Sequence, residues 1–182
     1  MKENKSQFAL LGLLADRAMS GYEIQKIINN SIGFFWQESF GQIYPNLKKM
    51  EEKGWAGSVQ IEQEGRPDKK VFKITKSGRE ELAAWLKRPP EKFPLRLEIL
   101  LKLFFGNHAK PEISIQHLES ELSNEVKMLE VYKNIKKEIG KCSHESQNLY
   151  SLITLDYGIG LAEHNIAWCK KSIQKLKKEL SK

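Results

Sequence analysis

Residues 39–53 carry polar and basic side chains at spacings that could recognise nucleic acid. Ile43, Leu47 and Met50 recur at helical spacing and predict a helix with one buried stripe. The side chains of this segment assigned to DNA contact are Ser39, Gln42, Tyr44, Asn46, Lys48 and Lys49. Amides can bond to base edges, a tyrosine hydroxyl can donate to phosphate, and lysines can neutralise phosphates. The segment therefore predicts a helix that enters a major groove.

A basic hairpin is expected directly after this helix. Residues 59–61 and 72–74 alternate apolar and polar side chains, as half-buried strands do. Between them, residues 65–68 read Gly-Arg-Pro-Asp, which is turn chemistry. Arg66, Lys69 and Lys70 make the tip basic, so that it could lie along a phosphate backbone. A groove-entering helix followed by such a hairpin is the layout of a winged helix-turn-helix.

Capping signals place the helices that hold these two elements. Ser20 and Glu23 have the spacing of a capping box, and Ser39 and Gln42 repeat it at the start of the groove-entering helix. The expected N-terminal caps in chain order are Ser6, Ser20, Ser39, and Thr75 or Ser77. Prolines at 89, 90 and 94 then mark a boundary. We expect a winged helix-turn-helix DNA-binding domain over residues 1–88 and a helical dimerisation and effector domain over residues 89–182.

The second half of the chain is expected to be entirely helical. Apolar runs predict helices over about 95–105, 114–139 and 144 to the C-terminus. In the last helix, apolar residues recur on a seven-residue repeat over four heptads, the signature of helix-on-helix supercoiling. The residues assigned to a dimer interface are Leu152, Leu155, Ile159, Ala162, Ile166, Cys169, Ile173 and Leu176. The fold class expected for the whole chain is mainly α with a small β-hairpin.

Four aromatic residues are candidates for an effector site. Phe34, Phe35 and Trp36 precede the groove-entering helix, and Trp168 lies on the heptad helix. Packing in the core or at an interface accounts for all four, and stacking on a flat aromatic ligand is the alternative. Both interpretations stay open at this point.

Composition narrows the function classes. The 182 residues carry a formal charge of +7, which favours a polyanionic partner. The apolar stretches are too short to span a membrane or form a secretory leader, so a cytoplasmic protein is expected. Cys142 and Cys169 do not suggest a disulfide framework. The four histidines lack ligand-like spacing and no nucleophile motif occurs, so we predict no metal, no cofactor and no enzyme activity.

One run of residues resembles the PadR family of bacterial transcriptional regulators. It reads Gly41-Gln42-Ile43-Tyr44-Pro45-x-Leu47-x-x-Met50-x-x-x-Gly54, then Gly65-Arg66-Pro67 and Phe72-x-Ile74-Thr75-x-x-Gly78-Arg79, and it is preceded by Ser20-Gly21-Tyr22-Glu23. The resemblance covers about residues 6–88, and the helical half is similar in layout to the larger subfamily. Phe72 departs from the pattern, because the family often has Tyr there.

The resemblance implies a winged-helix domain, a helical dimerisation domain and binding to inverted-repeat operators. By position, the implied DNA contacts fall on Tyr22, Gln42, Tyr44, Lys48, Arg66 and Lys69. We therefore expect a homodimeric, sequence-specific DNA-binding regulator, with repression as the default, and a small aromatic effector as a further ligand. A protein-interaction module built on a winged helix is the alternative, and a small enzyme in the helical half is a third class.

Overall fold

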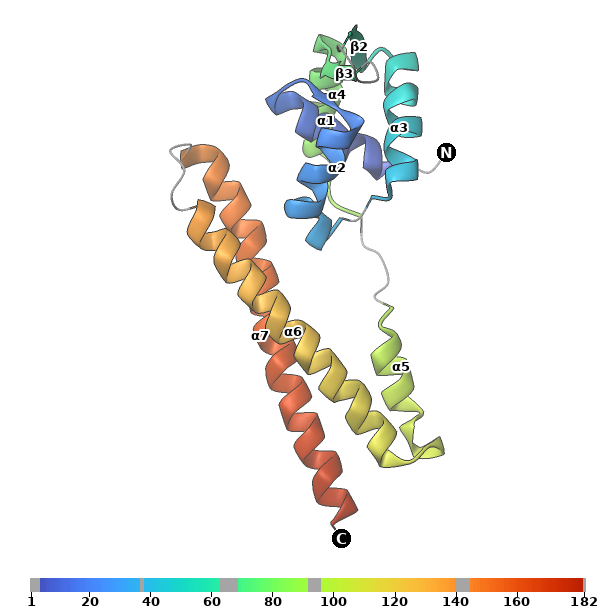
Figure 1. Cartoon of the computed structure of the whole chain (residues 1–182), viewed down its shortest axis with the longest axis vertical. Coiled ribbons are helices and arrows are strands. Elements are labelled where there is room, and N and C mark those ends of the chain that lie inside the picture. Colours follow the sequence, from blue (N-terminus) through green and yellow to red (C-terminus); the bar gives the residue numbers. More distant parts are fainter. Residues whose placement is uncertain (1–3, 37, 63–68, 92–95, 140–144, 182) are drawn as a thin grey trace. The chain divides into compact units, whose positions relative to one another are not determined.

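The computed structural model describes residues 4–36, 38–62, 69–91, 96–139 and 145–181, and it divides into two compact units. The first lies within residues 1–92 and the second within residues 93–182. Helices dominate both units, and a small antiparallel sheet lies in the first, which confirms the predicted fold class (Figure 1).

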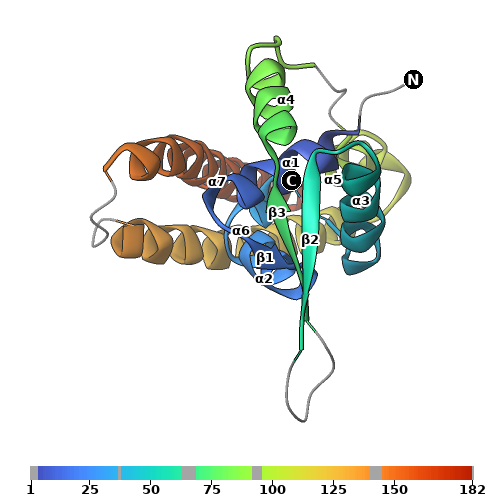
Figure 2. The same cartoon turned by 90° about the horizontal axis from the view of Figure 1, so that it is seen from above.

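The first unit is a winged helix-turn-helix. Its elements are α1 (Lys5–Asp16), β1 (Met19–Ser20), α2 (Gly21–Asn30), a 3-10 turn (Ile32–Phe34), α3 (Phe40–Glu52), β2 (Ala56–Ile61), β3 (Lys69–Ile74) and α4 (Lys76–Leu86). The strand order is β1-β3-β2, with Met19 opposite Phe72 and Ala56 opposite Ile74. Strand β1 adds a third member to the two-stranded hairpin expected from the sequence. In Figure 2 the hairpin runs out between α3 on one side and β1 and α2 on the other.

Helix ends follow local capping chemistry, with two departures from the predicted caps. The Ser20–Glu23 capping box is present, and the Thr75 hydroxyl accepts a hydrogen bond from Gly78 N–H at 3.0 Å. Ser39 occupies the cap position of α3, yet its side chain makes no capping hydrogen bond, so the predicted capping box there is wrong. Helix α1 is capped by Asn4 rather than Ser6, because the Asn4 carboxamide reaches Ser6 N–H at 3.1 Å.

Helix α3 is fixed to the rest of the first unit by its buried stripe. Ile43, Leu47 and Met50 are fully buried in a core that draws on α1, α2 and the sheet. At the C-terminal end of α3, the Lys53 ammonium donates to the Gln7 side-chain oxygen of α1 at 2.7 Å. It also lies 4.1 Å from the ring centre of Trp55. One face of α3 is therefore anchored in the unit, and side chains on the other face are exposed.

The second unit is a helical hairpin with a short helix beside it. Helix α5 (Glu98–Phe104) leads through a 3-10 turn (Gly106–His108) to α6 (Pro111–Ile139) and α7 (Glu145–Leu180), which run antiparallel side by side (Figure 1). The core joins Ile115 and Leu118 of α6 to Cys169 and Ile173 of α7. A hydrogen bond of 2.8 Å from the Asn165 amide to Glu125 ties the two helices further along.

This packing corrects the assignment of the heptad stripe to a second subunit. Leu155, Ala162, Cys169 and Ile173 are buried within the chain itself, and Cys169 is 0% exposed. The remaining members of the stripe, Leu152, Ile159, Ile166 and Leu176, are partly buried. The stripe was predicted correctly as a helix–helix seam, but its partner is α6, whose apolar residues recur at a matching spacing.

Candidate nucleic-acid interface

The outer face of α3 presents most of the side chains predicted to contact DNA. Gln42, Lys48 and Lys49 are exposed, and Tyr44 is 40% exposed. These residues lie opposite the buried stripe, so the helix is amphipathic in the sense required for groove entry. Ser39 is exposed at the start of the same helix. The face combines one amide, one phenol and two ammonium groups, which can bond to base edges and phosphates.

Asn46 does not belong to that face. It is only 3% exposed. Its amide nitrogen donates to the Gln42 carbonyl at 2.8 Å, and its amide oxygen accepts a hydrogen bond from the Asn4 side chain at 2.7 Å. Because both polar atoms are engaged inside the unit, the assignment of Asn46 to base reading is corrected to a structural role. Nothing in the local sequence pattern could reveal a partner forty-two positions away.

Two tyrosines lie where α2 meets α3. Tyr22 is 68% exposed in the first turn of α2. The preceding residue, Gly21, lies so close to the Tyr44 ring that a Cβ atom there would be 2.6 Å from Cζ of Tyr44. On its other side, the Tyr44 ring meets the Phe72 ring edge-on, with centroids 6.4 Å apart. A side chain at position 21 would therefore displace the outer end of the Tyr44 ring from its place between α2 and β3.

The basic residues at the base of the wing are paired with carboxylates. Arg66 lies outside the described residues. The Lys69 ammonium is 3.0 Å from a carboxylate oxygen of Glu23 on α2, and the Lys70 ammonium is 2.9 Å from one of Glu51 on α3. Sequence reasoning treated both lysines as phosphate ligands and missed the two acceptors, although Glu23 was identified as a capping residue.

Both carboxylates are held in the ionised form. Hydrogen bonds from the Ser20 backbone and hydroxyl, together with Lys69, lower the pKa of Glu23 from 4.5 to about 2. Burial alone would raise the pKa of Glu51, but the hydrogen bond from Ser58 and the ion pair with Lys70 outweigh it and lower the pKa. The charge on these acceptors therefore persists at neutral pH.

The four candidate effector residues divide between the two units. Phe35 is exposed, and the Trp36 indole N–H donates to Glu38 at 2.9 Å. Phe34 ends the 3-10 turn and is partly buried. Trp168 packs against the core of the second unit. An effector site formed by these residues stays a prediction.

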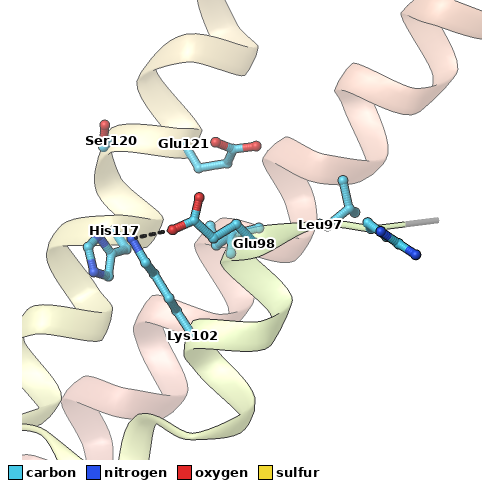
Figure 3. Close-up of a pocket in the computed structure, with 8 residues that line it drawn as sticks. Leu97, Glu98, Lys102, His117, Ser120 and Glu121 are labelled. Atoms are coloured by element: carbon cyan, nitrogen blue, oxygen red, sulfur yellow. Dashed lines mark ion pairs between the residues drawn. The ribbon is translucent and has the colours of Figure 1, made fainter.

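A separate pocket of about 360 Å³ lies between α5 and α6 (Figure 3). Its lining residues are Arg96, Leu97, Glu98, Ile99, Lys102, His117, Ser120 and Glu121. Glu98 and Lys102 already pair with each other at 3.0 Å, and the lining mixes both signs of charge. Within the described ranges, no three His, Cys, Asp or Glu side chains are placed to hold a metal ion. None of the described helices is long and apolar enough to cross a membrane.

Two sequence profiles match the chain, one in each unit. Residues 10–84 match the transcriptional regulator PadR-like family, and residues 95–177 match the virulence activator alpha C-terminal domain. The matched ranges coincide with the winged helix and with the helical hairpin.

Individual relatives agree with the profiles. A probable transcriptional regulator of Mycobacterium tuberculosis is 30% identical over 185 residues, covering 94% of this chain and 97% of that protein. The negative transcriptional regulator PadR of Bacillus subtilis is 36% identical over 100 residues, covering 54% of this chain and 55% of that protein. A crystal structure of Bacillus subtilis PadR in complex with operator DNA has the same fold, with a TM-score of 0.87 at 24% identity, covering 97% of this chain and 99% of that one. This chain belongs to the PadR-like family of transcriptional regulators.

Proposed function

We propose that this regulator binds double-stranded DNA in a sequence-specific manner and represses transcription as a homodimer on an inverted-repeat operator. The observation that carries the proposal is the outer face of α3, where Gln42, Tyr44, Lys48 and Lys49 are exposed on a helix whose opposite face is locked into the core. Such a helix can enter a major groove while the wing lies along the adjacent backbone. Repression is supported by the relative named as a negative regulator, and by the fact that blocking a promoter needs only occupancy.

Salt dependence of DNA binding tests the proposal. Each phosphate contact releases counterions, so the logarithm of affinity should fall linearly with the logarithm of salt concentration. Lys48→Ala should weaken binding to all sequences and reduce the slope by about one. Gln42→Ala should relax sequence preference, because it removes an amide that reads base edges. A flat salt response by the parent protein would rule the proposal out.

Selection of bound duplexes from a random pool supplies the operator. A homodimer should enrich two inverted half-sites about one helical turn apart, or a multiple of that spacing. Enrichment of a single unrepeated site would contradict the dimeric mode of binding.

An exposed apolar face of α7 supports dimerisation through the second unit. Tyr150, Ile153, Tyr157 and Leu161 follow one another at intervals of three and four residues and are all exposed, with Tyr150 and Tyr157 each 72% exposed. Contiguous apolar side chains on a surface mark interaction sites. We assign the subunit interface to this face, because the heptad stripe on the same helix is already occupied by α6.

The effector prediction is carried by Phe34, Phe35, Trp36 and Trp168, and its test is tryptophan fluorescence. Small aromatic compounds are titrated in the presence and absence of operator. Linkage requires that a compound which weakens DNA binding is itself bound more weakly when DNA is present. If Phe35→Ala and Trp168→Ala respond to the inducer as the parent does, the effector binds elsewhere.

A further inference from the structure

Strand β3 begins with two adjacent lysines that reach helices on opposite sides of the wing. Lys69 pairs with Glu23 at the start of α2, and Lys70 pairs with Glu51 near the end of α3. Adjacent residues of a strand point to opposite faces, which explains why the two ammonium groups diverge. Figure 2 shows the hairpin passing between these two helices. One ion pair therefore joins β3 to each of them.

Each carboxylate accepts a hydrogen bond from a serine in addition to its ion pair with lysine. Glu23 accepts hydrogen bonds from the Ser20 backbone N–H at 2.9 Å and from the Ser20 hydroxyl at 2.7 Å. Glu51 accepts one from the Ser58 hydroxyl at 2.5 Å, through the oxygen that does not meet Lys70. Both acceptors are thus pre-oriented charges rather than mobile surface carboxylates, and Lys70 also lies 4.9 Å from the centre of the Phe72 ring.

A pre-oriented carboxylate competes with phosphate for the same ammonium group. Both are oxyanions that accept charge-assisted hydrogen bonds from lysine. The intramolecular acceptor acts at a high effective concentration, whereas a phosphate of arbitrary DNA must displace it. Displacement is favoured only where other contacts hold the duplex against α3 and the wing.

We propose that Glu23 and Glu51 are specificity-determining residues, because they withhold the two wing-base lysines from the phosphates of non-cognate DNA. The inference rests on the proposed DNA-binding function and adds a role for two acidic side chains on a basic surface. Without these acceptors, Lys69 and Lys70 become free phosphate ligands. Binding to any duplex then strengthens, and the ratio of operator affinity to random-sequence affinity falls.

The test uses the full-length protein and a random-sequence duplex, so no operator is required. Glu51→Gln removes the charge and keeps an oxygen for Ser58. Glu52→Gln is the matched control, because Glu52 is exposed at the next position of α3 and its replacement changes the net charge equally. We expect the salt slope of Glu51→Gln to steepen by about one relative to Glu52→Gln. The ratio of the affinity of Glu51→Gln to that of Glu52→Gln for the random-sequence duplex should fall about threefold between about 50 and about 200 mM salt.

Three further variants test which lysine each carboxylate withholds from phosphate. In Glu51→Gln/Lys70→Gln, the slope should return to that of the control. Ser58→Ala should give a smaller change in the same direction, because it loosens Glu51 without removing it. Glu23→Gln preserves the capping box, since glutamine also caps α2, and should release Lys69. A circular dichroism melt identifies any variant that fails to fold.

Equal slopes for Glu51→Gln and Glu52→Gln, in a parent protein that binds DNA with normal salt dependence, would overturn this inference alone. So would a steepened slope that persists after Lys70 is replaced. A parent protein with no salt-dependent binding would remove the proposed function and this inference together. Once the operator is known, the ratio of operator affinity to random-sequence affinity should be lower for Glu51→Gln than for Glu52→Gln, and an unchanged ratio would contradict the role in specificity.

Discussion

The amide of Asn46 joins α3 to the segment that caps α1. Replacing it with alanine takes away the acceptor that the Asn4 amide reaches at 2.7 Å. Asn4 itself is exposed, so water can take the place of that acceptor, and we expect Asn46→Ala to lower the free energy of unfolding by about 0.5–1.5 kcal/mol, the net contribution of one hydrogen bond. Urea unfolding measures this loss. Selected DNA sequences should stay the same, in contrast to Gln42→Ala; a changed sequence preference with unchanged stability would return Asn46 to the reading face.

The Glu23 carboxylate should make the free energy of unfolding decrease as the pH is lowered below about 4.5. Its pKa in the folded protein is about 2, against an ordinary 4.5, so its contribution is complete above about pH 4.5 and disappears as the pH falls towards 2. The side chain is 34% exposed. Solvent screening therefore keeps the contribution to about 1–2 kcal/mol. Unfolding free energies at pH 7 and pH 3 should differ less in Glu23→Gln than in the parent, and equal differences would show that the ion pair and cap add nothing.

At the scale of elements, α4 depends on one glycine. A Cβ atom at Gly78 would run into the Trp55 carbonyl, which also accepts the Thr75 N–H bond at 3.0 Å. Gly78→Ala should therefore destabilise by about 1–3 kcal/mol or more, because backbone has to move. Gly12→Ala in α1 is the control, since a Cβ atom at that position would meet no other group within 4 Å. It should be neutral or stabilising by about 0.5–1 kcal/mol, and thermal melts compare the two.

At the scale of the whole molecule, we expect one face of α7 to stabilise the fold of the chain and the other to bind a second copy. Ala162 is buried against α6, whereas Tyr157 is exposed on the proposed subunit interface. Tyr157→Glu should yield folded monomers, because a charge enters an apolar interface between copies. Ala162→Glu should instead unfold the helical hairpin. Sedimentation combined with circular dichroism distinguishes these outcomes, and a fully dimeric Tyr157→Glu would move the interface to another surface.

Local signals in the sequence were sufficient for the elements, but not for all of their partners. The capping box at Ser20, the cap at Thr75 and the buried stripe of α3 depend on residues a few positions apart, so sequence spacing predicts them. The ion pair of Lys69 with Glu23 is a contact between distant residues. Heptad periodicity likewise indicates a helical partner without saying whether it lies in the same chain, and here α6 supplies it.

The cap of α1 has a practical consequence for handling the protein. Asn4 accepts a hydrogen bond from Ser6 N–H and donates one to Asn46, so the start of α1 is linked to α3, the helix proposed to enter the groove. An affinity tag fused ahead of Asn4 adds bulk beside these two bonds, whereas a tag after the end of α7 is attached to the other unit. Binding constants should accordingly be taken from protein carrying its tag at the C-terminus, or from protein whose leading residues are native.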